Sequence, residues 1–473
     1  MVNYECLKGL EPAEFFRWFG AVSRIPRGSG KEAGFVEFLR QFAAERKLFF
    51  TADGENNVLI RVPASAGYET QPPFLFQAHS DMVWRKEQGK EFDFETQPIP
   101  LMVQGDRLIA DGTTLGADNA VGLATMLALA DGDHPHPELE LLFTSREEVG
   151  MLGARAYDYS AIRARRMVNM DCGDSHVLCV TSAGSTVCRV TGAFSMEPVT
   201  EGRCLHLRPV GGLGGHSGLC ANMGRSCAAN LLGDLLLDLP VRICSCFGQG
   251  AILKSCEAVV ILPEDISVHA LQDKFDALAS VCAGSDPGWR LEVKPAEAAS
   301  ALSVEDSANI ALALSLLRTG QFRADGMDPR IIVTSGHIGS FSLVFGAFEL
   351  AFAVRSASDA DADSLVARYA AILRRLGIAL EVTDRKTGWQ EDRGSVLRQK
   401  FQRVHTRLFG EEMELERVHG GVEVGVVKGA IPDMDAVGVA PTARGAHTTG
   451  EYLLLDEVQP YWQLILGVLE EKE

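Results

Sequence analysis

The chain has 473 residues, of which 46% are hydrophobic and 23% are charged, and its formal net charge is −18. This length is too great for one ordinary hydrophobic core, so at least two domains are expected. The acidic balance argues against a nucleic acid or an anionic membrane surface as the main partner and favours a small substrate.

The N-terminal stretch MVNYECLKGLEPAEFF lacks a basic region followed by a continuous apolar run, and no later segment is apolar over the length that a membrane span requires. We therefore expect a cytoplasmic protein. The eleven cysteines include no CxxC pair, which predicts buried reduced thiols and no zinc ribbon. Any bound metal should be held by His, Asp and Glu.

The first part of the chain alternates helical and strand-like segments. PAEFFRWFGAVSRI and KEAGFVEFLRQFAAERK carry apolar residues at helical spacing, whereas NVLIRV, PFLFQA, ELELLF and RMVNM are typical of short buried strands. Between the second and third strands, DNAVGLATMLALAD has the length and apolarity of a buried helix that begins with a capping Asp or Asn. This alternation predicts an α/β architecture with functional residues at the strand ends.

The character of the sequence changes twice along the chain. After about residue 187 it has longer alternating runs, glycine clusters and helical stretches, which indicate a separate α+β domain. Near GWQEDRGS it becomes polar, and two more helical stretches follow. We predict that residues 1–187 form the first part of one domain, that residues 188–390 form an inserted α+β domain, and that residues 391–473 return to the first domain.

Acidic residues recur where the buried runs of the first segment stop. His79 and Asp81 follow the strand PFLFQA, Asp118 opens the buried helix, Glu147 and Glu148 follow ELELLF, and Asp171 follows RMVNM. Each has an ordinary explanation taken alone, as a helix cap or a solvated strand end. Together they would bring at least four carboxylates into one cleft, where mutual repulsion would keep several of them protonated. Two divalent cations about 3.5 to 4 Å apart resolve this, with zinc the best match and manganese or cobalt as alternatives.

The motifs QAHSDMV, GTTLGADNAVG, TSREEVG, NMDCGD, GGHSG, HGGVEVG and GAHTTGEYL occur in this order along the chain. In order and spacing they resemble the di-zinc M20 metallopeptidases, most closely the aminoacyl-histidine dipeptidases, or cytosolic non-specific dipeptidases. The resemblance implies a catalytic α/β domain, with a mixed sheet flanked by helices, interrupted by an α+β lid. It also implies a small peptide substrate and a homodimer.

The resemblance further implies a role for each motif residue. Asp118 would bridge the two metals and would be joined to Asn119 by a cis peptide bond. Glu147 would be the general base that takes a proton from the metal-activated water, and Asp81 would orient a metal-bound histidine. The other ligands would be His79 and Asp171 on one metal, and Glu148 and His447 on the other.

The middle of the chain supplies the candidate substrate residues. By the same resemblance His216 in GGLGGHSG would stabilise the oxyanion as the lid closes, Arg355 would meet the substrate's C-terminal carboxylate, and Glu423 would receive its α-amino group. His419 would bind substrate beside Glu423, although either residue could instead support the metal ligands. Without the resemblance, His216 is a loop histidine and Arg355 belongs to a structural ion pair.

Two stretches depart from the family pattern. GAILKSCEAVV lacks the Asn, Pro and Arg of an NAIPRE-like segment, and Ser185 replaces a glycine. These departures touch no metal ligand, but they bear on substrate choice. The sequence therefore predicts a dipeptidase for dipeptides with a free N-terminus, of Xaa-His or broad specificity. The alternatives are an M20 tripeptidase or N-acyl amino-acid deacylase, or a non-catalytic peptide-binding relative.

Overall fold

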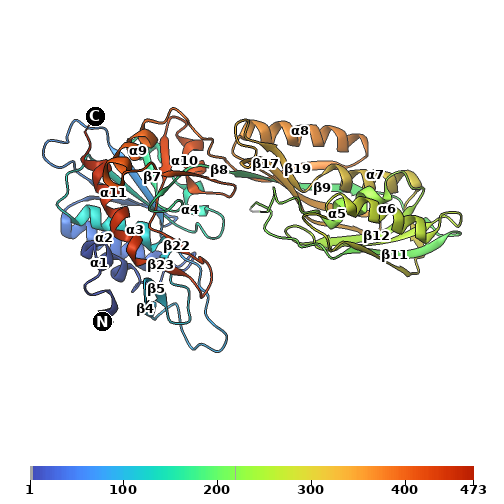
Figure 1. The fold of residues 1–473 in the computed structure, drawn as a ribbon, viewed down its shortest axis with the longest axis horizontal. Helices are drawn as coiled ribbons and strands as arrows, with labels where there is room; N and C mark the ends of the chain where they lie inside the picture. The colour runs from blue at the N-terminus through green and yellow to red at the C-terminus, as the bar shows by residue number, and fades with distance from the viewer. Residues whose placement is uncertain (1–3, 219, 473) are drawn as a thin grey trace. The chain divides into compact units, whose positions relative to one another are not determined.

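The computed structural model describes residues 4–218 and 220–472, and these form two compact units (Figure 1). Unit 1 comprises the described residues of Met1–Thr181, Glu391–Arg417 and Val422–Glu473, and unit 2 comprises those of Ser182–Gln390 and Val418–Gly421. Each unit has its own hydrophobic core.

Unit 1 is built on an eight-stranded mixed sheet with the strand order β1-β2-β6-β3-β7-β21-β8-β20. Its strands are β1 (Phe49–Ala52), β2 (Val58–Val62), β3 (Phe74–His79), β6 (Leu139–Thr144), β7 (Arg166–Asn169), β8 (Val177–Ser182), β20 (Glu414–Val418) and β21 (Asp435–Gly438). The central strands β6, β3, β7 and β21 run parallel, while β1 and β2 pair antiparallel at one edge. A smaller sheet joins β4 (Leu101–Gln104), β5 (Arg107–Ala110), β22 (Ala443–Arg444) and β23 (Tyr452–Leu454). The predicted α/β class is confirmed.

Helices pack around the large sheet of unit 1. They are α1 (Ala13–Val22), α2 (Ala33–Arg46), α3 (Ala117–Asp131), α4 (Leu152–Ala156), α9 (Val396–Phe409), α10 (Glu423–Ala430) and α11 (Val458–Glu470), with single turns at Glu5–Leu7, Tyr159–Ala161 and Leu455–Glu457. Helix α3 is apolar on nearly every side, so it is buried along its length, between α1 and β3. This packing fixes the start of α3 near the end of β3, where the candidate ligands lie.

Unit 2 contains a nine-stranded antiparallel sheet covered by four helices on one face (Figure 1). The strands are β9 (Gly184–Ala193), β11 (Arg203–Val210), β12 (Arg242–Gln249), β13 (Glu257–Leu262), β14 (Arg290–Pro295), β16 (Gly320–Ala324), β17 (Ile332–Val344), β18 (Ala347–Ser356) and β19 (Ala379–Lys386). The helices are α5 (Ala228–Leu236), α6 (Val268–Ser280), α7 (Val304–Leu316) and α8 (Asp359–Arg375), and β10 (Glu197–Pro198) pairs with β15 (Ser300–Ala301). Alternate residues of β18 point to opposite faces of the sheet. One face carries the buried Phe348, Leu350, Phe352 and Val354, and the other carries Arg355.

The cysteines form no disulfide among the described residues; seven of them are buried and four are partly buried. No helix in the part of the chain that the structure describes is long and apolar enough to cross a membrane.

Candidate metal and catalytic site

Three parallel strands of unit 1 end at the same edge of the sheet. In the register of these strands His79 pairs with Thr144, and Gln77 pairs with Asn169. His79 is the last residue of β3 and is 1% exposed. The residues that follow Thr144 and Asn169 leave the sheet at this same edge. Glu147, Glu148 and Asp171 therefore lie beside His79.

Asp118 reaches this edge from the start of α3. The turn before it has Gly116 at φ 68°, a conformation that favours glycine. The peptide bond between Asp118 and Asn119 is cis, as the resemblance predicts. The Asn119 side chain donates to Asp171 Oδ1 at 3.1 Å and accepts from Gly122 N at 3.0 Å, so it ties the start of the helix to the Asp171 loop.

The predicted ligands form two groups that share Asp118. Nε2 of His79 lies 2.8 Å from Asp118 Oδ1 and 3.3 Å from Asp171 Oδ1. Nε2 of His447 lies 2.7 Å from Glu148 Oε2 and 3.3 Å from Asp118 Oδ2. In each group the candidate ligand atoms lie within 4.8 Å of one another. The two oxygens of Asp118 therefore face two different histidines, as a bridging carboxylate would.

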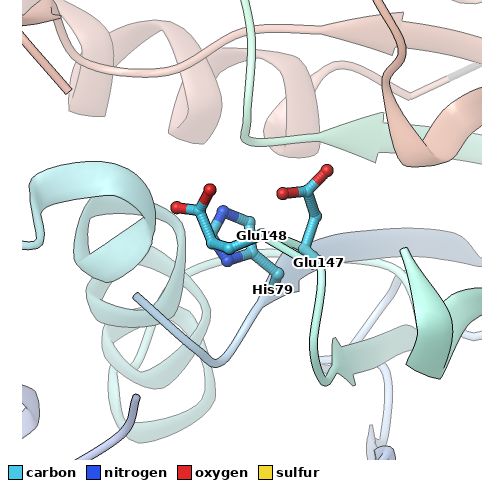
Figure 2. A group of neighbouring side chains, drawn as sticks. All are labelled: His79, Glu147 and Glu148. Carbon is cyan, nitrogen blue, oxygen red and sulfur yellow. The ribbon is translucent and has the colours of Figure 1, made fainter. Parts of the chain in front are cut away.

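Glu147 and Glu148 are neighbours with different surroundings (Figure 2). The Glu148 side chain is 4% exposed, and its Oε1 is buried without a hydrogen-bond partner, which suits a cation ligand. Figure 2 shows Glu148 beside the His79 ring and Glu147 extending separately from the same turn. Glu147 also forms a third group with His79 and Glu148. The residue before them, Arg146, has a positive φ of 51°.

Asp81 links the histidine to the two glutamates. Its Oδ1 lies 3.4 Å from His79 Nδ1 and accepts from Glu147 N at 2.9 Å. Its Oδ2 accepts from Glu148 N at 3.3 Å. Asp81 is fully buried, so these contacts fix both the imidazole ring and the turn that carries the glutamates.

The charges that crowd together in this cluster shift the pKa values of its members. Burial lowers the pKa of His79, but Asp171 and the hydrogen bonds with Asp118 and Asp171 outweigh it and hold this pKa well above the usual value. Hydrogen bonds with Asp118 and Glu148 raise the pKa of His447 to about 10. Burial raises the pKa of Glu147 to about 9. Such shifts are expected where several carboxylates share one site without cations.

The predicted substrate residues of unit 2 also lie near one another. Arg355 on β18 pairs with Ser335 on β17, and burial lowers the pKa of its guanidinium. Burial and the charge of Arg355 lower the pKa values of His216, His337 and His419, those of the last two to about 4. No carboxylate among the described residues forms an ion pair with Arg355. The structural ion pair considered from the sequence is therefore absent there.

The HGGVEVG motif is divided between the two units. His419 belongs to unit 2, where its Nε2 lies 2.7 Å from Ser335 Oγ. Glu423 begins α10 in unit 1 and is fully buried. Its Oε2 accepts from Gln77 Nε2 and from Thr144 Oγ1, while Oε1 is buried without a partner. Glu423 belongs to none of the three candidate ligand groups.

Residues 75–471 match the family model described as Peptidase family M20/M25/M40. The chain belongs to this family. This M20 peptidase is 29% identical over 485 residues to the cytosol non-specific dipeptidase of Escherichia coli (strain K12), a match covering 98% of this chain and 99% of the relative. It is also similar to the crystal structure of aminoacylhistidine dipeptidase from Vibrio alginolyticus, with a TM-score of 0.92, 25% identity, and coverage of 99% and 98% of the two chains. Aminopeptidase PepT from Bacillus cereus shares the fold, with a TM-score of 0.59 and 16% identity over 98% of each chain. The family resemblance is confirmed.

Sequence reasoning missed four residues that hold the site of the M20 peptidase, of which Arg27, Glu32 and Glu451 are buried. Glu451 accepts from Gly116 N at 2.8 Å and from Asp118 N at 3.1 Å, and burial raises its pKa to about 7. Arg27, Ser29 and Glu32 contact the ligand loops from the segment between α1 and α2. A signal existed for Glu451, which lies within the GAHTTGEYL motif. The segment IPRGSGKE offers none, because its composition is that of a surface turn.

Proposed function

We propose that this M20 peptidase is a dipeptidase that uses two divalent cations, most suitably zinc with manganese or cobalt as alternatives, to hydrolyse dipeptides with a free amino terminus. The observation that carries this proposal is Asp118, whose two oxygens face the separate groups of His79 and His447. The choice of dipeptides is supported by the dipeptidase names of two relatives that match nearly the whole chain.

The donor set suits such cations because it combines imidazole nitrogens with carboxylate oxygens. His79 and Asp171 would hold one cation, Glu148 and His447 the other, and Asp118 both. When bound, the cations would polarise the scissile carbonyl group and lower the pKa of the attacking water. The buried Oε1 of Glu148, which has no partner, would then gain one.

Glu147 is the proposed general base. Its main-chain N–H is held by Asp81 at 2.9 Å, so the turn is fixed while the carboxyl group remains able to exchange a proton. The positive charge of cations bound at the neighbouring ligand groups would favour the carboxylate form of Glu147 and lower its pKa from about 9. Glu147 would take a proton from the attacking water and deliver it to the leaving amine nitrogen.

His216 and Arg355 are the proposed substrate contacts from unit 2. Gly218 N donates to His216 Nδ1 at 3.2 Å, which makes Nδ1 an acceptor and places the proton of the neutral ring on Nε2. An Nε2–H group can donate to the substrate's carbonyl oxygen as negative charge develops there. Arg355, which lacks a carboxylate partner among the described residues, would bind the substrate's C-terminal carboxylate.

Glu423 and His419 complete the proposal. The Oε1 atom of Glu423 would accept a hydrogen bond from the α-amino group of the dipeptide. This assignment is supported because Oε1 is buried and has no hydrogen-bond partner. His419 would support the substrate site through its contact with Ser335. We also propose a homodimer, as the resemblance implies, and a cytoplasmic location, as the name of the Escherichia coli relative suggests.

A substrate panel tests the reaction class. The purified protein is offered Xaa-His dipeptides including carnosine, other dipeptides, tripeptides and N-acetyl amino acids, and the released amino acids are quantified. Cleavage confined to dipeptides with a free amino terminus is the expected result. Preference for tripeptides or N-acetyl amino acids would assign another M20 reaction, and two bound cations without any cleavage would indicate a peptide-binding relative.

A further inference from the structure

The six residues Arg27–Glu32 lie between α1 and α2 and contact three of the loops that carry candidate metal ligands or the general base. Arg27 is 1% exposed and Glu32 is fully buried, although the segment has the composition of a surface turn. Its backbone is pinned to the first loop, because Met82 N donates to Arg27 O at 3.0 Å. The two ends of the segment are therefore buried beside the site, whereas Gly30 and Lys31 between them are exposed.

The guanidinium of Arg27 joins two of these loops. Its Nη1 donates to Asp81 O at 2.8 Å and to Ser80 O at 3.3 Å, in the loop after β3. Its Nη2 donates to Gly116 O at 2.6 Å, in the loop before Asp118. The nitrogens of a guanidinium are held at fixed positions in one plane, so this fork sets the distance between the two loops. A lysine ammonium could not reproduce such a planar bridge.

Ser29 and Glu32 connect the same segment to the third loop. Ser29 Oγ donates to Asp81 Oδ2 at 2.7 Å, and Asp81 in turn accepts from Glu147 N and Glu148 N. Oε1 of Glu32 accepts from Arg146 N at 3.1 Å, where the backbone has its positive φ of 51°. The segment thus fixes the turn that presents the two glutamates.

Charge adds to this geometry. The carboxylates of Glu451, Asp81, Asp118 and Glu148 all act on Arg27, and although burial lowers the pKa of its guanidinium to about 10, the group stays protonated at neutral pH. Removing this cation would take one donor from each of three carbonyl oxygens and would leave the carboxylates around it without its compensating charge. The site would then lose both its spacing and part of its charge balance.

We propose that Arg27 is a positioning residue that sets the spacing between the His79 and Asp118 loops before any cation binds, with Ser29 and Glu32 extending this frame to the Glu147–Glu148 turn. The expected effect on cation affinity rests on the proposed function. The expected effect on the metal-free protein does not depend on it.

The test compares Arg27→Lys with Arg61→Lys in the full-length protein. Arg61 is a control because its guanidinium also bridges two separate segments, donating to Glu140 Oε1 at 3.0 Å and to Ala161 O at 2.6 Å, and it contacts none of the candidate ligands. Hydrogen–deuterium exchange is measured on metal-free protein, in peptides that cover the two loops joined by Arg27 (the His79–Met82 loop and the Asp118 loop), the Arg146–Glu148 turn and, as a reference, α9. Zn²⁺ affinity is measured by titration calorimetry.

For Arg27→Lys we expect exchange at least tenfold faster in both loops and parental exchange in α9, together with Zn²⁺ affinity at least tenfold weaker. The Arg61→Lys variant should keep parental values in both loops and in affinity. Parental exchange in the two loops of Arg27→Lys overturns the proposal, as does a loss of affinity that Arg61→Lys shares. A parent protein that binds no Zn²⁺ would contradict the proposed function alone, because the exchange measurement still decides the role of Arg27.

Ser29→Ala keeps the proposal open to refutation if Arg27→Lys does not fold. This variant removes only the hydroxyl that braces Asp81 Oδ2. We expect faster exchange confined to the Arg146–Glu148 turn, and a kcat reduced at least threefold with KM within twofold of the parent. Ser29→Thr, which retains a hydroxyl, should restore both values. Parental exchange and parental kcat in Ser29→Ala would overturn the proposal.

Discussion

Exchange of Glu147 for Gln separates proton transfer from cation binding. Glutamine has nearly the same shape as glutamate, and the N–H of residue 147 would still donate to Asp81 as it does at 2.9 Å. The His79–Asp118–Asp171 and Asp118–Glu148–His447 groups do not include Glu147 and stay complete. The substitution therefore removes the proton acceptor and little else.

The expected loss of activity follows from what a positioned base contributes. General acid–base catalysis contributes about 10²- to 10⁴-fold, which corresponds to about 2.7 to 5.4 kcal/mol of transition-state stabilisation. We expect kcat for a dipeptide to fall by this factor in Glu147→Gln, with KM nearly unchanged. Bound metal, measured by atomic emission, should equal that of the parent.

The same variant makes a pH-dependent prediction for the metal-free protein. Burial raises the pKa of Glu147 from 4.5 to about 9, so the folded state holds a proton that the unfolded state loses as pH rises through this window. Stability of the parent should therefore decline between about pH 4.5 and 9 on account of this group. Because Gln lacks this contribution, the melting temperature of metal-free Glu147→Gln should equal or exceed that of the parent at pH 7.

Glu148→Gln is the matched control, because Glu148 belongs to a candidate ligand group and should lose metal together with activity. Near-parental kcat in Glu147→Gln, or loss of metal equal to that of Glu148→Gln, would refute the division of roles between the two glutamates.

Three further changes have expected outcomes. His216→Ala should lower kcat about 10²-fold, the typical cost of losing one oxyanion donor, and leave metal content unchanged by atomic emission; unchanged kcat would remove His216 from the mechanism. Leu123→Ala in the buried helix α3 should reduce the free energy of unfolding by about 3 kcal/mol in denaturant titration, because Leu123 is fully buried, and a change near zero would contradict that packing. Zn²⁺ binding to metal-free protein at pH 7 should release protons, because the pKa values of His79 and His447 are raised and both rings must lose a proton to bind a cation. Calorimetry in two buffers of different ionisation enthalpy measures the number of protons released. Equal heats of binding in the two buffers would contradict the prediction.

Periodicity and burial patterns predicted much of unit 1. The stretch DNAVGLATMLALAD corresponds to α3 (Ala117–Asp131), and PFLFQA and ELELLF correspond to β3 and β6. The spacing of apolar residues within each of these elements indicates its buried side, so the pattern can be recognised in a single sequence. The placement of acids at the ends of parallel strands then predicted that His79, Asp118, Glu148 and Asp171 would meet.

Contacts between distant segments could not be predicted in this way. Arg27 binds carbonyl groups 53, 54 and 89 residues away, and nothing in the local sequence distinguishes it from a solvated loop arginine. The sharing of Asp118 between two groups, and the cis bond after it, were implied by the resemblance and not by spacing. For His419 the motif left a substrate contact and a supporting role open, and its neighbour Ser335, 2.7 Å away, is a partner that only the fold of unit 2 reveals.

The most direct test of the account is stepwise metal reconstitution of chelated protein, with bound Zn²⁺ or Mn²⁺ and dipeptide hydrolysis measured at each step. We predict that chelation abolishes hydrolysis, that the protein takes up two equivalents of metal, and that Asp118→Ala binds neither tightly because both groups lose their shared carboxylate. Hydrolysis that survives chelation, or Asp118→Ala protein that still binds two equivalents as tightly as the parent, would contradict a site built around this bridging residue.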